Sequence, residues 1–179
     1  MGKKYIRLYT GDGNGQNAAA LGLALRAARA RKKVIMLQFM KNPDYSALLE
    51  PSRVSRFELE QYGSDVDITH EFNTDDILRA YKGLERFRTV VCSGDYDMVI
   101  ADEINFALHQ NLFPFSDLRD ILKNRAPFTE IIFTGSYAPQ ELIRAADLVS
   151  DMREIMHYCT RGIEPPFGFR YLTEVVADG

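Results

Sequence analysis

A glycine-rich stretch between two apolar segments constrains the fold more than any other feature of the sequence. It reads Thr10-Gly11-Asp12-Gly13-Asn14-Gly15-Gln16-Asn17, between an apolar run at 5–9 and an alanine- and leucine-rich run at 18–25. The first run predicts a strand and the second a helix. Alternating glycines let successive backbone N–H groups point at one spot, and the helix N-terminus behind them favours an anion. The order therefore predicts a phosphate-binding loop.

The end of this loop differs from that of a working Walker loop. Such a loop ends Gly-Lys-Ser/Thr, where the lysine contacts the β- and γ-phosphates and the hydroxyl holds magnesium. Here the two positions are Gln16 and Asn17, whose side chains carry no charge. A charge-assisted hydrogen bond is roughly twice as strong as a neutral one. We therefore expect weakened nucleotide binding, with one neutral hydrogen bond still available from Gln16. The alternative is a glycine-rich turn with no ligand.

Length and composition restrict the class of protein. The chain has 179 residues, of which 46% are hydrophobic and 26% charged, and its net charge is −3. These values are typical of one globular domain, which we expect to span 1–179. Basic side chains cluster only at 26–33, where they stabilise the C-terminus of a predicted helix. Because no other basic patch is present, we expect no nucleic-acid partner. Without a signal peptide or a run of about 18 apolar residues, we expect a cytoplasmic protein with no membrane contact.

Apolar runs alternate with helical patterns along the rest of the chain. Strands are predicted at 34–39, 56–62, 98–101, 130–134 and 148–155, and helices at 75–93, 104–110, 116–125 and 139–146. Asn73 or Thr74 is the predicted cap of the long helix. Polar and apolar residues alternate at 56–62, which predicts a strand near a sheet edge. The succession predicts an α/β fold with a doubly wound, mostly parallel sheet. Cys92 and Cys159 are expected to be buried free thiols.

An acidic pair ends one of the predicted buried strands. Asp102 and Glu103 directly follow the apolar run at 98–101. In open α/β sheets, ligands bind at the carboxyl ends of the strands, where a carboxylate reaches the magnesium of a phosphate-loop site. Asp102 and Glu103 are therefore candidate metal ligands. An acidic pair after an apolar strand also occurs by chance, and that alternative stays open.

Seven short motifs occur in order along nearly the whole chain. They lie at 9–13 (Tyr-Thr-Gly-Asp-Gly), 18–27, 38–41, 102–105 (Asp-Glu-Ile-Asn), 134–135, 146–149 and 152–154 (Met-Arg-Glu). Together they resemble the ATP:corrinoid adenosyltransferases of the CobA/CobO/BtuR type. The resemblance implies a RecA-like P-loop NTPase fold and a homodimer. It also implies transfer of the 5′-deoxyadenosyl group of ATP to cob(I)alamin or a cobyrinic acid precursor, with magnesium.

The resemblance also assigns roles by position. It implies that the loop glycines cradle phosphate, that Asp102 and Glu103 lie beside the metal, and that Asn105 lies on the wall of the site. The complete expected nucleotide-binding set is Thr10, Gly11, Asp12, Gly13, Asn14, Gly15, Gln16, Asn17 and Asn105.

The chain departs from the family pattern where charge and aromatic rings would act. The family has Gly-Lys-Gly-Lys-Thr-Thr in place of residues 13–18, which lack both lysines and both hydroxyls. Its Gly-Phe-Thr-Trp segment, which faces the corrinoid, has no counterpart at 63–67. A Gly-Arg-Gly turn is replaced at 135–137, a Lys-His pair at 156–157, and a basic stretch at 162–166.

Two hypotheses from different classes follow. The first is a cob(I)yrinic acid a,c-diamide (corrinoid) adenosyltransferase whose catalysis we expect to be impaired or lost, with Lys41 as the nearby replacement cation. The second is a non-catalytic regulator or subunit that binds a nucleotide, a corrinoid or a protein partner on the same fold. A phosphate-loop kinase or GTPase is less favoured, because those reactions depend more strongly on the missing lysine.

Overall fold

All the strands that the structure describes belong to one parallel sheet. The computed structural model describes residues 5–13, 15–40, 54–63 and 71–156. In this part of the chain six strands are ordered β3-β2-β4-β5-β1-β6, and every neighbouring pair is parallel. Their bounds are β1 Ile6–Thr10, β2 Val34–Gln38, β3 Phe57–Gln61, β4 Met98–Asp102, β5 Glu130–Phe133 and β6 Leu148–Asp151. The parallel α/β sheet expected from the sequence is confirmed.

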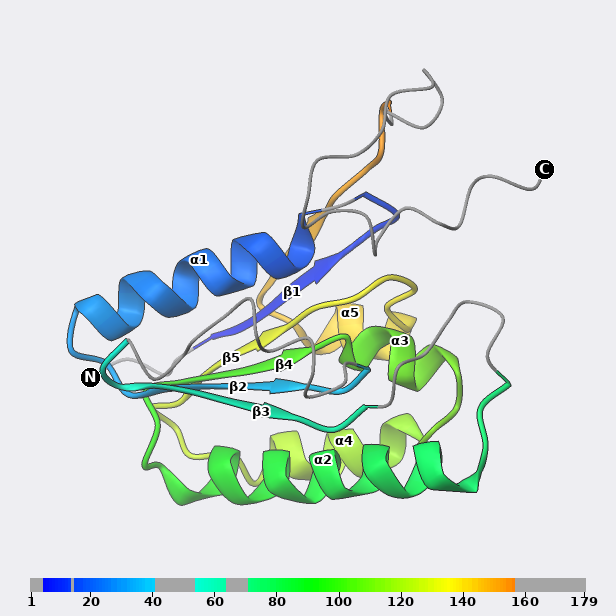
Figure 1. Ribbon diagram of the computed structural model, residues 1–179, viewed down its shortest axis with the longest axis horizontal. Helices are drawn as coiled ribbons and strands as arrows, with labels where there is room; N and C mark the ends of the chain where they lie inside the picture. The colour runs from blue at the N-terminus through cyan, green and yellow to red at the C-terminus, as the bar shows by residue number, and fades with distance from the viewer. Residues whose placement is uncertain (1–4, 14, 41–53, 64–70, 157–179) are drawn as a thin grey trace.

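Helices cover both faces of the sheet. The helix α1 (Gln16–Arg29) lies on one face, and α2 (Thr74–Ser93) and α4 (Phe115–Lys123) lie on the other (Figure 1). Two short helices, α3 (Ile104–His109) and α5 (Gln140–Ala145), follow β4 and β5 in the chain. Because all the described strands are parallel, their carboxyl ends lie along one edge of the sheet. No described helix has the length and apolar composition needed to cross a membrane.

The helix α2 begins at a capping box. The side chain of Asn73 accepts hydrogen bonds from the backbone N–H groups of Asp75 and Asp76, at 2.8 and 3.3 Å. The Asp76 carboxylate in turn accepts from the backbone N–H of Asn73 at 3.0 Å. Reciprocal bonds of this kind satisfy N–H groups that have no partner inside the helix. The cap predicted at Asn73 is confirmed, and the helix ends before Gly94, which has the left-handed φ of 76°.

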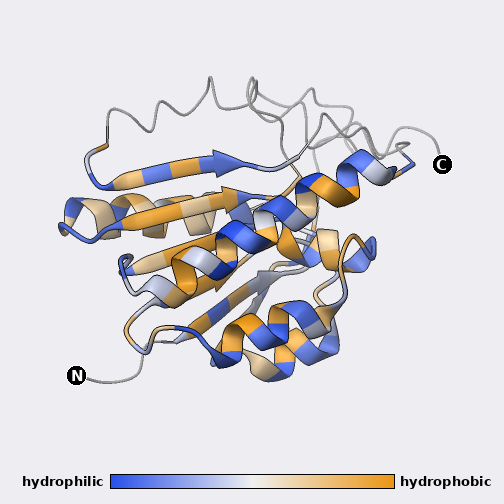
Figure 2. Cartoon of the chain, turned by 90° about the horizontal axis from the view of Figure 1, so that it is seen from below, coloured by the Kyte–Doolittle hydropathy of each residue, from blue (hydrophilic) through white to orange (hydrophobic). Residues whose placement is uncertain are grey.

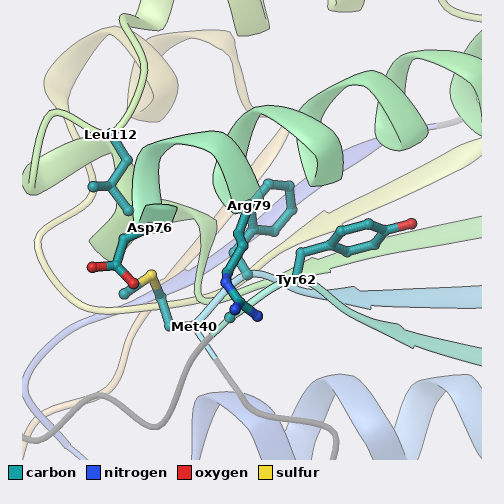
Figure 3. Close-up of a pocket in the computed structure, with 7 residues that line it drawn as sticks. Met40, Tyr62, Asp76, Arg79 and Leu112 are labelled. Atoms are coloured by element: carbon teal, nitrogen blue, oxygen red, sulfur yellow. The ribbon is translucent and has the colours of Figure 1, made fainter. Parts of the chain in front are cut away.

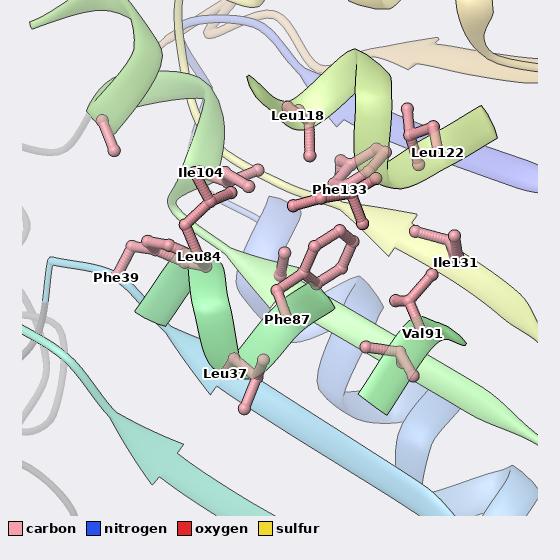
Figure 4. Close-up of a cluster of buried hydrophobic side chains, with 14 of the residues drawn as sticks. Leu37, Phe39, Leu84, Phe87, Val91, Ile104, Leu118, Leu122, Ile131 and Phe133 are labelled. Carbon is pink, nitrogen blue, oxygen red and sulfur yellow. The ribbon is translucent and has the colours of Figure 1, made fainter. Parts of the chain in front are cut away.

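The core lies mainly between the sheet and the helices α2 and α4. Phe87 of α2 packs on Phe133 of β5 with ring centroids 5.7 Å apart, and Leu118 of α4 closes the same cluster (Figure 4). On the opposite face, α1 meets the sheet through Ala20, Ala24 and other small residues. Small side chains allow the backbone of α1 to lie close to β1 and β4. That proximity fixes the loop before α1 at the carboxyl edge.

Hydropathy separates the edge strand from its neighbour. Polar and apolar residues alternate along β3, whereas β2 is apolar up to its last residue (Figure 2). The predicted edge position of the alternating strand is confirmed. The predicted strand 148–155 is too long, because β6 ends at Asp151 and residues 152–154 pack against the glycine-rich loop. The sequence also predicts loops at 40–55 and 63–72 and a turn-rich segment at 165–171, of which residues 41–53, 64–70 and 165–171 lie outside the described residues.

The prediction of a buried thiol at Cys92 is wrong. Cys92 is free and exposed on the last turn of α2. The buried stripe of this helix passes through Phe87, Val90 and Val91, so the next position turns toward solvent. Cys159 lies outside the described part of the chain.

Two helical glycines provide a matched test of how closely α2 approaches the sheet. A Cβ on Gly83 would lie 3.0 Å from ring or Cβ atoms of Phe39 and Tyr62, whereas one on Gly22 of α1 would meet no atom within 4 Å. Overpacking costs about 1–3 kcal/mol, while alanine is favoured over glycine in an open helix by roughly 0.5–1 kcal/mol. We expect Gly83→Ala to lower the free energy of unfolding in urea and Gly22→Ala to raise it. Equal stabilisation by both would contradict the close approach.

Candidate functional site

Polar side chains end four adjacent strands and form one hydrogen-bonded row. Gln61 Nε2 donates to Gln38 Oε1 at 2.9 Å, and Gln38 Nε2 donates to Asp102 Oδ2 at 2.8 Å. On the other side of Asp102, Thr134 Oγ1 donates to Oδ1 at 2.6 Å. The parallel register places Gln38 beside both Gln61 and Asp102. We call these four residues the carboxyl-edge row, which runs from β3 to the residue after β5.

The predicted acidic pair lies in this row, and its two residues differ in position. Asp102 is fully buried, and both of its carboxylate oxygens accept the hydrogen bonds just described. Glu103 has a left-handed backbone with φ of 62°, and its N–H donates to Thr134 Oγ1 at 3.0 Å. Glu103 Oε2 lies 3.1 Å from where a Cβ on Gly135 would be. Glu103 is therefore held against the turn that follows β5.

The glycine-rich loop is fastened to the segment after β6. The N–H of Gly13 donates to the carbonyl of Met152 at 2.8 Å, and Asp12 Oδ1 accepts from the N–H of Glu154 at 3.1 Å. A Cβ on Gly11 would lie 2.1 Å from the Met152 carbonyl, and Gly11 has φ of 114°. Only glycine fits such a contact and such a backbone angle. The packing of the loop on 152–154 thus requires glycine at Gly11, and it also requires glycine at Gly13, where a Cβ would lie 2.9 Å from the backbone of Arg153.

Gln16 ties the loop to the turn after β5. Its side chain is buried; Nε2 donates to the carbonyl of Gly11 at 2.8 Å, and Oε1 accepts from the N–H of Gly135 at 2.9 Å. We call this pair of bonds the Gln16 clip. The amide that stands at the Walker lysine position is therefore engaged with the protein's own backbone.

Asn105 lies at the meeting point of β1, β4 and the turn after β5. It is fully buried, and its Nδ2 donates to the carbonyls of Gly135 at 2.6 Å and Tyr9 at 3.3 Å. Asn105 Oδ1 has no hydrogen-bond partner in the described structure. Leaving a buried acceptor unpaired costs about 1–3 kcal/mol. The two carbonyls fix the orientation of the amide, because a flipped oxygen would face both of them.

Of the other expected nucleotide-binding residues, Thr10 and Asn17 flank this assembly. Thr10 Oγ1 accepts from the N–H of Ala138 at 3.3 Å, and Asn17 lies half-buried in the first turn of α1. Asn14 lies outside the described residues. Gly15 is the N-cap of α1, with φ of 144°, and no side chain caps the helix there. The first N–H groups of α1 and the helix dipole therefore still favour an anion at this end.

The residues around Asp102 do not fit a directly bound magnesium ion. Mg²⁺ is usually held by one or two carboxylates together with substrate phosphates. Asp102 is enclosed and already accepts a hydrogen bond at each oxygen. Among the described residues, no group of three or more His, Cys, Asp or Glu side chains could hold a metal ion. Direct coordination at Asp102 would require the row to open.

Residues in or beside β3, and one residue just before β4, have shifted pKa values. The Arg86 guanidinium donates to both oxygens of Glu60 and holds the pKa of that carboxyl below its usual range. Burial, followed by the hydrogen bond to Glu60, raises the pKa of Tyr62. Burial and the bond to Glu58 raise the pKa of Tyr96, which precedes β4, to about 12. These tyrosines are neutral at pH 7.

Sequence reasoning did not assign site roles to Gln61, Gln38 and Thr134. Each is the last residue of a strand or follows it directly. A polar residue that ends an otherwise apolar run at the carboxyl edge is the signal that could have identified them.

Three comparisons relate the chain to known proteins. The family model described as ATP:corrinoid adenosyltransferase BtuR/CobO/CobP matches residues 2–171. The Corrinoid adenosyltransferase of Escherichia coli K12 is 28% identical over 169 residues, covering 93% of this chain and 85% of that protein. The Uncharacterized protein all2391 of Nostoc is 31% identical over 174 residues, covering 85% of this chain and 44% of that protein. The chain thus spans less than half of the Nostoc relative.

A solved structure supports the fold. The flagellar accessory protein FlaH from Methanocaldococcus jannaschii superposes with a TM-score of 0.57 at 10% sequence identity, over 84% of this chain and 72% of that chain. FlaH has the RecA-like P-loop ATPase fold, so the fold class expected from the sequence is confirmed.

Substitution of Asn105 tests the geometry at the centre of the site. In Asn105→Asp an oxygen replaces the Nδ2 donor and faces the carbonyls of Gly135 and Tyr9. Leaving those groups unpaired costs about 1–3 kcal/mol, and more when the new carboxyl is charged. Because that carboxyl would have a raised pKa in the folded state, we expect the loss of stability in urea to increase as pH rises above about 4.

The control for this prediction is Asn111→Asp, at an exposed asparagine of left-handed φ whose weak bond to the His109 carbonyl measures 3.4 Å. Asn111→Asp should change the free energy of unfolding by no more than about 0.5 kcal/mol. Equal effects of the two substitutions would contradict the assigned role of Asn105.

Proposed function

The chain belongs to the ATP:corrinoid adenosyltransferase family, and we propose that it is a ligand-binding member in which adenosyl transfer is impaired or lost. On this proposal it binds a nucleotide or a corrinoid and acts as a regulator or subunit. The candidate ligands are the two molecules in the family name, ATP and a corrinoid. The proposal is that this chain binds one of them without efficient adenosyl transfer.

The observation that carries the proposal is the Gln16 clip. A lysine at this position would bring a positive charge to the phosphates, and such a charge also offsets charge that develops during group transfer. Gln16 brings no charge, and both ends of its amide are engaged by Gly11 and Gly135. The site therefore lacks its strongest expected phosphate contact. Because adenosyl transfer depends on positioning the triphosphate, we expect its rate to fall more than the affinity for the ligand.

Weak anion binding is nevertheless compatible with the geometry. The N-terminus of α1 has no side-chain cap and carries no acidic residue in its first turn. Its free N–H groups favour an anion even without a lysine. This supports a member that binds a ligand rather than one that has lost all binding.

A second candidate, an active transferase, is favoured by a different observation. Asp102 and Glu103 occupy the carboxyl edge two strands from the loop, on the strand where a metal-associated acid is expected in this fold. Activity would require a replacement cation, for which Lys41 is the sequence candidate; Lys41 lies outside the described residues. MgATP and a homodimer belong to both candidates as implications of the resemblance, and the cytoplasmic location expected from the sequence belongs to both as well.

Calorimetric titration with MgATP, combined with an assay of adenosylcobalamin formation from cob(I)alamin, tests the proposal. We expect the native chain to give no product above the uncatalysed background. We expect Gln16→Lys with Asn17→Thr to bind MgATP at least about tenfold more tightly, which corresponds to about 1.4 kcal/mol. Robust turnover by the native chain would exclude impaired catalysis and establish the second candidate.

Gln16→Leu is the matched control, because it removes the clip without adding a charge. If Gln16→Leu tightened binding as much as the restored lysine, release of the loop rather than charge would explain the gain. We expect no tightening, together with a loss of stability from the unpaired Gly135 N–H.

A further inference from the structure

The edge strand β6 differs from the other described strands because both of its faces are exposed. Leu148 and Val149 are successive residues, so their side chains point to opposite faces of the sheet. Leu148 is 47% exposed and Val149 is 39% exposed. Strands of a parallel sheet are usually covered on both faces. The apolar side chains of β6 therefore lack the covering that the fold gives to its neighbours.

The opposite edge strand, β3, is protected by charge and by a helix. Glu60 of β3 is held by Arg86 of α2 at 2.8 Å, and Arg79 of the same helix lies beside Tyr62, which follows β3 (Figure 3). Charged residues on an edge strand discourage pairing with another chain. In contrast, β6 carries no charged residue before Asp151, its last residue. Of the two described edges, β6 is therefore the one suited to pairing.

The segment after β6 continues this exposed apolar surface. Ile155 is 94% exposed and Met156 is 61% exposed. In Figure 1 the segment, drawn in orange, extends away from the helices and the other strands. We call residues 148–156 the β6 edge. An exposed edge with apolar side chains is a template on which another strand can add.

The outer side of the β6 edge presents backbone hydrogen-bonding groups. On the inner side, the N–H of Met152 donates to β1 at 2.8 Å, and the N–H of Glu154 donates to Asp12 Oδ1 at 3.1 Å. Successive residues of an extended chain direct their backbone groups to alternate sides, so those of Asp151 and Arg153 point outward. No strand pairs with this side in the part of the chain that the structure describes.

The sequence of the β6 edge is complementary to itself in the antiparallel direction. In a twofold pair, a residue that faces a second position is also faced by that position from the other copy. With Met152 at the centre, Val149 faces Ile155 and Asp151 faces Arg153 of the second copy. Centring the pair on Asp151 or on Arg153 would instead place like charges opposite each other, which is destabilising. The register about Met152 also makes the outward-pointing residues hydrogen-bonded partners.

We propose that the β6 edge is the interaction surface for a second copy of this chain, paired antiparallel about Met152. Leu148 and Met156 meet at the two ends of the pair. Asp151 pairs with Arg153 of the second copy in place of the exposed bond of 3.0 Å that the two residues form within one chain. The family resemblance implies a homodimer but indicates no surface for it. The inference supplies that surface and does not depend on which ligand binds.

Pairing at the β6 edge lies beside the glycine-rich loop. Residues 152–154 bond with the loop on their inner side and with the second copy on their outer side. Association therefore supports the segment on which Gly11 and Gly13 pack. An interface of one strand from each copy is smaller than the about 1,200–2,000 Å² of stable complexes, so we expect the dimer to dissociate on dilution.

Sedimentation velocity of the full chain over a range of concentrations tests the surface. Ile155→Asp places a carboxylate opposite Val149 of the second copy, and the exposure of Ile155 makes unfolding of the variant unlikely to confuse the result. We expect this substitution to weaken dimerisation at least about tenfold. The matched control is Leu78→Asp, which removes an exposed apolar side chain from α2 and should change dimerisation less than about twofold.

Exchange of charge between two variants tests the register. Asp151→Arg and Arg153→Asp each place like charges opposite each other, and each should weaken self-association at least about tenfold. An equimolar mixture of the two variants should form a heterodimer, because opposite charges then face each other. The pair within one chain stays broken in both variants, so its loss cannot explain recovery on mixing.

Amide hydrogen exchange distinguishes strand pairing from association through another surface. The N–H groups of Asp151 and Arg153 should exchange more slowly as the concentration of the native chain rises. A native chain that stays monomeric at every concentration, a dimer unaffected by Ile155→Asp, or a mixture that does not associate would overturn the proposal. Slow exchange at every concentration would also overturn it, because another segment of the same chain would then cover the edge.

Discussion

The parallel register of the sheet is the constraint on which the whole site depends. Because neighbouring strands run in one direction, Gln61, Gln38 and Asp102 end at the same height and their side chains meet without any loop to bring them together. Thr134 completes the row from the adjacent strand. Buried polar groups in such a row must satisfy one another, since an unpaired member would cost about 1–3 kcal/mol. The row consequently fixes the positions of the residues at both of its ends.

Thr134 connects this row to the loop. Its hydroxyl donates to Asp102 and accepts from the N–H of Glu103, while the next residue, Gly135, donates to Gln16. The turn after β5 is therefore in contact with the acidic pair on one side and with the loop on the other. A ligand that opened the Gln16 clip would release a hydrogen bond at the same turn that positions Glu103. Two parts of the site are thereby coupled through adjacent backbone groups.

Periodicity was sufficient to predict the sheet, because buried parallel strands are short apolar runs and α2 has a clear stripe and cap. The alternation at 56–62 even located the sheet edge. Periodicity failed where tertiary contacts decide: residues 152–154 follow directly on the predicted strand but leave the sheet, where Met152 and Glu154 bond with Gly13 and Asp12. The sequence could not predict the Gln16 clip. A glutamine side chain can bind a phosphate or a backbone group, and only the fold places the Gly11 carbonyl and the Gly135 N–H beside it.

The loop glycines carry less information about the ligand than their pattern suggests. Gly11 and Gly13 are needed because the carbonyl of Met152 and the backbone of Arg153 occupy the space that a side chain would fill. That need exists whether or not a phosphate binds, so glycine spacing indicates the fold and the path of the chain. The charge at position 16 reports on the ligand, because nothing in the backbone geometry demands a cation there. In this chain the residues required by packing match the family pattern, whereas the cation required only by a phosphate is replaced by an amide that serves the fold.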